Sequence, residues 1–104
     1  MTILLTVLLA LPAYAQDADA GKATYTANCM ACHGTGGAGD GPAAIALSPP
    51  PQSFTDKAFW DGKTDAVLKT TIKAGKPGTA MSGFSQLSDA DVANLIAYMK
   101  TFKP

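Results

Sequence analysis

The chain has 104 residues, in which eight lysines are balanced by eight aspartates, with neither arginine nor glutamate. This length allows one small domain. The zero formal charge gives no indication of a nucleic-acid surface or a basic membrane patch. Ten glycines and seven prolines favour short helices joined by long loops, as in a chain that wraps a cofactor.

The N-terminal segment, residues 1–15, has the pattern of an export signal. An almost continuous apolar run is followed by the tripeptide Ala13-Tyr14-Ala15, which fits an A-x-A cleavage site. The segment lacks the usual basic residue at its start. About a dozen apolar residues are too few to span a membrane, which takes about 20. We predict a signal peptide cleaved near Ala15, no membrane span in the mature form, and a periplasmic domain of residues 16–104.

The first helix of the mature chain is predicted to run to about Cys29, with Asp17 or Asp19 as its N-cap. Gly21 and Tyr25 lie four residues apart and therefore share one face. A glycine inside a helix costs about 1 kcal/mol relative to alanine. A close crossing by another helix would explain why it is present.

Directly after this helix comes Cys29-Met30-Ala31-Cys32-His33, the attachment pattern of c-type haem. Two thiols at this spacing can add to the two vinyl groups at one porphyrin edge, and the histidine beside them then lies under the ring. A structural zinc site needs four ligands, but these are the only cysteines and the only histidine. A disulfide would leave His33 unexplained, and no βαβ pattern supports a thioredoxin-like site. We predict one haem c, held by Cys29 and Cys32.

The next segment, residues 34–42, is rich in glycine and is predicted to be a loop. It lacks the Lys-Ser/Thr ending and the preceding strand of a phosphate-binding loop, so we expect its glycines to let the backbone pass close to the porphyrin edge. The Pro42 carbonyl is a candidate acceptor for the N–H of His33, with a plain loop proline as the alternative. Residues 43–47 are predicted to form a short turn, and residues 48–51 an extended segment over one haem edge.

Three aromatic residues follow, namely Phe54, Phe59 and Trp60. All three are predicted to belong to the core. Trp60 has a second candidate role, because its indole N–H can donate to a haem propionate.

The second main helix is predicted from Thr64, its N-cap, to Ala74, with Gly75 ending it. Leu68 and Ile72 share its apolar face. The opposite side carries lysines at helical spacing, which form either a solvated face or a small basic docking patch for a redox partner. They are Lys69, Lys73 and Lys76.

The last helix is predicted to begin after Ser88, which together with Asp91 matches a relaxed capping box. Its apolar residues recur at i, i+3, i+4 and i+7 and form one stripe. They are Val92, Leu95, Ile96 and Met99. No alternating strand pattern and no repeat is found, so the predicted fold is all-α, with three main helices and long loops.

The second iron ligand follows by exclusion. Because the chain has one histidine, a second histidine ligand is ruled out within it, and methionine, lysine, water or an open site remain. Met1 lies in the signal, Met30 between the cysteines and Met99 on the core stripe. Met81, in a Gly/Pro-rich loop, is the predicted ligand, with simple packing as the alternative. A thioether opposite imidazole raises the reduction potential and suits one-electron transfer.

With these motifs, the chain resembles the small monohaem class I c-type cytochromes of bacteria, over nearly all of its mature length. The matching blocks are Gly21–Cys29, the Cys29–His33 motif, Gly39–Ala43, Gly78–Phe84 and Leu87–Tyr98. The Gly39–Ala43 block is similar to the subset related to the cytochrome subunits of cbb-type oxidases. Ser82 departs from the resemblance, since many members have proline after the methionine ligand.

The resemblance implies a cytochrome c-like fold whose first and last helices cross near Gly21, Tyr25, Leu95 and Tyr98. It also places Phe84 in the methionine loop, as a further residue of the haem site.

The predicted function is one-electron transfer without enzymatic turnover. The expected partners are a donor dehydrogenase or reductase and an acceptor oxidase or reductase, and the chain is expected to act as a monomer. The main alternative is a dedicated haem subunit of a dehydrogenase or oxidase complex. A gas-binding or peroxidase-like haem protein is a third interpretation, for which the chain offers no second histidine and no arginine as distal group.

Overall fold

The computed structural model describes residue 3 and residues 16–104, so the predicted signal peptide of residues 1–15 lies outside the described residues except for residue 3. The regular elements of the described part are all helices, joined by long loops, and no strand occurs among these residues, which confirms the all-α prediction. Its elements are α1 (Ala18–Asn28), α2 (Met30–His33), a 3-10 turn (Ala44–Ala46), α3 (Lys57–Trp60), α4 (Asp65–Ala74), α5 (Asp89–Met99) and a final 3-10 turn (Lys100–Phe102).

The three main helices, α1, α4 and α5, have the predicted caps. Asp17 rather than Asp19 caps α1, because its carboxylate accepts from two N–H groups of the first turn, at 2.9 and 3.2 Å. Thr64 caps α4 through the N–H of Val67 at 3.2 Å. At α5, Ser88 and Asp91 form both hydrogen bonds of the capping box. The short helices α2 and α3 were not predicted, because four residues are too few to show a helical period.

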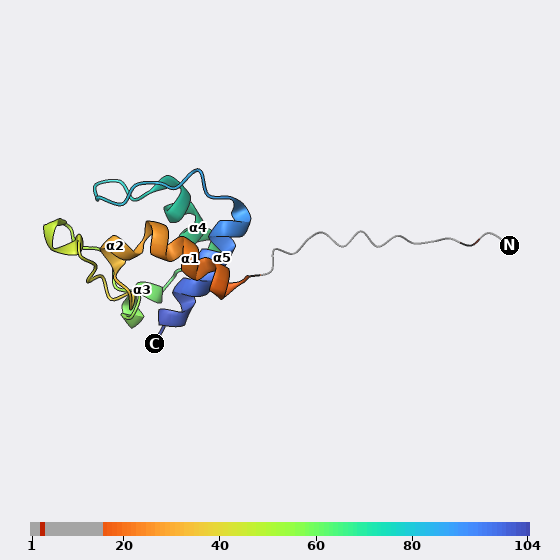
Figure 1. Ribbon diagram of the computed structural model, residues 1–104, viewed down its shortest axis with the longest axis horizontal. Coiled ribbons are helices and arrows are strands. Elements are labelled where there is room, and N and C mark those ends of the chain that lie inside the picture. The colour runs from red at the N-terminus through yellow and green to blue at the C-terminus, as the bar shows by residue number, and fades with distance from the viewer. Residues whose placement is uncertain (1–2, 4–15) are drawn as a thin grey trace.

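Helices α1 and α5 cross at the centre of the domain, and α4 packs beside α5 (Figure 1). Gly21 lies buried at the crossing, where a Cβ atom would stand 2.5 Å from the carbonyl carbon of Asn94, with the carbonyl oxygen nearer still. Tyr25 and Leu95 are fully buried beside it. The implied crossing near these residues is therefore confirmed, and it explains the glycine inside α1.

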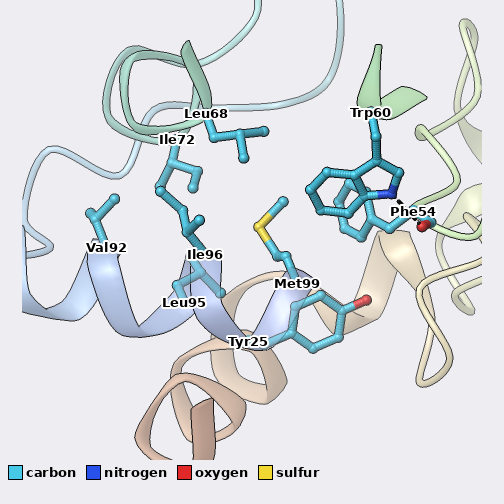
Figure 2. Close-up of a cluster of buried hydrophobic side chains, with 9 residues drawn as sticks. All are labelled: Tyr25, Phe54, Trp60, Leu68, Ile72, Val92, Leu95, Ile96 and Met99. Carbon is cyan, nitrogen blue, oxygen red and sulfur yellow. Dashed lines mark hydrogen bonds between the residues drawn. The ribbon is translucent and has the colours of Figure 1, made fainter. Parts of the chain in front are cut away.

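The core lies between α5, α4 and the aromatic segment around α3 (Figure 2). All four residues of the predicted α5 stripe are buried, together with both predicted apolar residues of α4. The nine buried side chains are Tyr25, Phe54, Trp60, Leu68, Ile72, Val92, Leu95, Ile96 and Met99. Burying a large apolar side chain stabilises the fold by about 1.5–3 kcal/mol relative to exposure.

The glycine-rich segment of residues 34–42 folds against the protein itself. A Cβ atom on Gly41 would lie 2.5 Å from the carbonyl carbon of Ala31 in α2, and one on Gly37 would lie 2.6 Å from the Phe102 ring. These glycines therefore serve close packing on α2 and on the C-terminal turn. None of them lines either of the two cavities described below.

Candidate functional site

The Cys-x-x-Cys-His motif lies where α1 gives way to α2. The Cys29 N–H donates to the Tyr25 carbonyl at 2.8 Å, and the His33 N–H donates to the Cys29 carbonyl at 2.9 Å. Residues separated by three and four positions share one helical face. Cys29, Cys32 and His33 accordingly line the same cavity of about 310 Å³.

Both cysteines are free thiols and half-buried. Burial, together with the smaller effect of the neighbouring Cys32, raises the pKa of the Cys29 thiol to about 11. The disulfide alternative is therefore wrong for this structure. The zinc alternative also lacks support, because no group of three or more His, Cys, Asp or Glu side chains suited to a metal ion occurs among the described residues.

A second cavity of about 530 Å³ adjoins the α4 side of the site and is lined by apolar core residues such as Leu68, Ile72 and Met99. Four residues line both cavities, namely His33, Gln52, Lys76 and Met81. The two cavities thus meet at the predicted iron ligands, His33 and Met81, and the two thiols line the first cavity. This apolar space, with thiols at one end and a nitrogen and a sulfur donor at its middle, fits a flat macrocycle tethered by its edge.

His33 is fixed from two directions. Its Nδ1 lies 3.0 Å from the Gln52 carbonyl oxygen, and because a carbonyl only accepts, Nδ1 carries the proton and Nε2 keeps its lone pair for a metal. The ring also stacks on Phe54, with 4.5 Å between centroids and 20° between planes. Burial lowers the pKa of His33, so the imidazole is neutral and able to ligate near pH 7.

The acceptor for His33 is a correction to the sequence prediction. Pro42 was the candidate, but it is exposed and lines neither cavity. The Gln52 carbonyl accepts the hydrogen bond instead, because the chain around residues 52–54 returns to the Cys-x-x-Cys-His motif. It is held there by the Phe54 N–H, which donates to the Gly37 carbonyl at 2.6 Å.

Met81 lies in the loop of residues 75–88, between α4 and α5, which we call the Met81 loop. It is half-buried, and among the methionines of the described part it alone lines both cavities, whereas Met99 lines only the second. Phe84, from the same loop, lines the first cavity, and its N–H donates to the Ile72 carbonyl at 2.8 Å. The loop is thereby anchored to the end of α4.

Trp60 is buried in the core, which confirms the first of its two predicted roles. Its indole N–H donates to the Phe54 carbonyl at 2.8 Å, and Trp60 lines neither cavity. Because indole has a single N–H, the structure engages that donor within the protein and does not direct it to a propionate.

Two of the three lysines of α4 and its end are paired with one carboxylate. Lys69 and Lys73 lie 3.0 and 3.5 Å from the same Asp89 oxygen, and hydrogen bonding and attraction by Lys69 lower the pKa of Asp89. Lys76 instead lines both cavities. This arrangement favours the solvated helix face over a continuous basic patch.

Gln52, Phe54 and Lys76 are site residues that the sequence did not reveal in these roles. Gln52 contributes only a backbone carbonyl, which any residue type would supply, so no sequence signal marks it. The proline segment is better predicted, because Pro49, Pro50 and Pro51 line the first cavity.

Comparison with known proteins places the site in a family. The family model for cytochrome c matches residues 18–103. Cytochrome c-555 of Chlorobaculum tepidum is 37% identical over 95 residues, which cover 84% of this chain and 78% of that protein. The cbb3-type cytochrome c oxidase subunit FixP of Bradyrhizobium diazoefficiens is 30% identical over 83 residues, which cover 80% of this chain and 27% of that subunit. Among solved structures, the Kuenenia stuttgartiensis reducing HAO-like protein complex contains a similar fold, with a TM-score of 0.72 and 28% identity over 82% of this chain and 42% of that one.

Proposed function

Because this chain belongs to the cytochrome c family, whose model covers residues 18–103, we propose that it is a one-electron carrier in which His33 and Met81 ligate the haem iron. The family carries one haem c bound covalently through a cysteine pair, and this chain has a single pair, Cys29 and Cys32. The observation that carries the proposal is that His33 and Met81 line both cavities beside those thiols. When bound, the haem supplies a reversible one-electron couple.

The protein's part in this function is to hold two ligands and keep water away. His33 is neutral, and its ring is held by the Gln52 carbonyl and by Phe54. A thioether from Met81 opposite an imidazole favours the reduced state and raises the potential. The apolar side chains of the second cavity provide a shell of low polarity, which also tunes the potential.

The surface next to the first cavity suits a partner with few charges, because Lys76 is the one charged residue among those lining that cavity. All sixteen charged side chains lie outside residues 41–55 and 77–88, the two segments that supply most of that cavity's wall. Ile45, in the 3-10 turn of the first segment, is 96% exposed. A charged partner surface would lose hydration here with Lys76 as the one counter-charge on the cavity wall, so we expect docking that depends little on salt.

The second candidate function is that of a haem subunit within a larger oxidoreductase. The observation in its favour is the similarity to the FixP subunit, of which this chain matches 27%. Size-exclusion chromatography of the native protein from its own cells separates the two, since a carrier elutes alone and a subunit with its complex.

We further propose that the chain is exported and cleaved near Ala15, because its apolar N-terminal run ends in the tripeptide Ala13-Tyr14-Ala15, which fits a cleavage site. In the described residues no helix is both long enough and apolar enough to cross a membrane. Mass spectrometry of the purified holoprotein tests the cleavage site, and a mature chain that retains residues 1–15 would overturn it.

The ligand set is tested by visible absorption spectra of the reduced and oxidised holoprotein, with and without carbon monoxide. His/Met ligation predicts a low-spin spectrum, a weak far-red iron–sulfur band in the oxidised form, and no response to carbon monoxide. Met81→Ala should abolish the far-red band, and Met99→Leu is the matched control that should keep it. A high-spin spectrum, or ready binding of carbon monoxide by the unaltered protein, would overturn the proposal.

A further inference from the structure

The Met81 loop contains a closed turn between Lys76 and Met81. The Lys76 N–H donates to the Met81 carbonyl at 3.1 Å, which ties the two ends of the turn together. Inside it, the Thr79 hydroxyl donates to the Lys76 carbonyl at 2.7 Å and accepts from the Met81 N–H at 3.2 Å. One side chain therefore bonds to both ends of the turn, including the backbone of Met81 itself.

Little apolar packing fixes this turn from outside. Pro77, Gly78 and Ala80 are exposed, as is Ser82 directly after the methionine. Proline at the Ser82 position would restrict the backbone, but serine does not. Thr79 is half-buried and lines the first cavity beside Met81. Its two hydrogen bonds therefore restrain the backbone next to the predicted methionine ligand.

We propose that Thr79 is a positioning residue that holds Met81 in place for iron ligation, through the two hydrogen bonds of its hydroxyl group. The proposal rests on the proposed function, in which Met81 is a ligand. When both hydrogen bonds are present, the Met81 backbone has one position relative to the end of α4. When they are absent, the turn gains freedom and the fraction of molecules with Met81 withdrawn increases.

The test is the binding of imidazole to the ferric holoprotein, which requires Met81 to leave the iron. The apparent affinity of such a ligand scales with the fraction of protein in the open state. Thr79→Val keeps the branched shape and removes the hydroxyl, and we expect its apparent dissociation constant for imidazole to fall about tenfold. Thr79→Ser restores the hydroxyl and should return the constant to near that of the unaltered protein.

The matched control is Thr70→Val. Thr70 also has a hydroxyl that donates to a backbone carbonyl, that of Ala66 at 3.0 Å, but it lies on the exposed face of α4. The Thr70→Val change therefore removes a similar hydrogen bond at a position away from the site, so the affinity for imidazole should not change. A general loss of stability would move both valine variants, whereas a positioning role moves only Thr79→Val.

Failure of the proposal is distinguishable from failure of Met81 ligation. If the unaltered protein shows the far-red iron–sulfur band but Thr79→Val binds imidazole within twofold of it, the role of Thr79 is overturned and the ligand stands. If the unaltered protein lacks the band, the proposed ligand is wrong. Should Thr79→Val not fold, hydrogen exchange of the unaltered protein decides, because a rapidly exchanging Met81 amide would refute the hydrogen bond to Thr79.

Discussion

The crossing of α1 and α5 makes Gly21→Ala the sharpest test of the fold. The added Cβ would lie 2.5 Å from the Asn94 carbonyl carbon and 3.0 Å from the Leu95 nitrogen. Since carbon atoms pack best at about 3.5–4.0 Å, the helices must separate by about 1 Å. Overpacking of this kind costs about 1–3 kcal/mol, and we take the upper end because the obstacle is backbone. Alanine recovers about 1 kcal/mol of helix propensity, which leaves a net loss of about 2 kcal/mol.

Chemical or thermal unfolding of the holoprotein, followed by circular dichroism at the helical band, measures this loss. For a domain of this size, about 2 kcal/mol lowers the melting temperature by about 8–16 °C. The control is Gly36→Ala, where a Cβ meets nothing within 4 Å and the backbone is not left-handed. That change should be neutral or stabilising by about 0.4–1 kcal/mol. If both variants unfold at the same midpoint, the close crossing does not limit residue size as we argue.

Two further changes test the contacts around the haem site. Tyr25→Phe removes the buried hydrogen bond of the Tyr25 hydroxyl to the Gly34 carbonyl, at 2.6 Å, and leaves that carbonyl without its partner. We therefore expect the free energy of unfolding to fall by about 1–3 kcal/mol, while the far-red band is retained. An unchanged unfolding midpoint would contradict this prediction. Ile45→Lys adds one positive charge to the segment of residues 41–55, which carries none. Repulsion of up to about 1 kcal/mol between two copies should slow electron self-exchange, measured by NMR line broadening, by about two- to fivefold at low salt and not at high salt. Ala23→Lys, exposed on α1, adds the same charge elsewhere and should leave the rate unchanged; equal slowing by both variants would show that exchange does not use this face.

The features that the sequence predicted well are those that depend on neighbours in the chain. The caps of α1, α4 and α5 depend on side chains within three residues of the helix start. The common wall formed by Cys29, Cys32 and His33 follows from helical spacing alone. Because such features need no knowledge of the tertiary fold, residue type and spacing were sufficient.

The features that were missed depend on contacts distant in sequence. The acceptor for His33 is a carbonyl nineteen residues away, and its identity depends on how the chain returns over the motif. The Trp60 indole bonds to the Phe54 carbonyl, only six residues away. Its acceptor is a backbone group, however, which no pattern of residue types indicates. Pro42 was the candidate because its carbonyl can accept a hydrogen bond, but every backbone carbonyl can do so, and this property does not single out one residue.

The two predicted ligands are held by structures of different kinds, and this difference bears on how the site behaves. His33 belongs to a helix, its Nδ1 bonds to a backbone carbonyl, and its ring stacks on Phe54, which is only 4% exposed. Met81 belongs to a loop, and its backbone is held by hydrogen bonds within a largely exposed turn. Segments with few buried contacts open locally at the lowest free-energy cost. Any ligand exchange at this haem should therefore begin on the Met81 side, while His33 and the two thiols keep the haem attached.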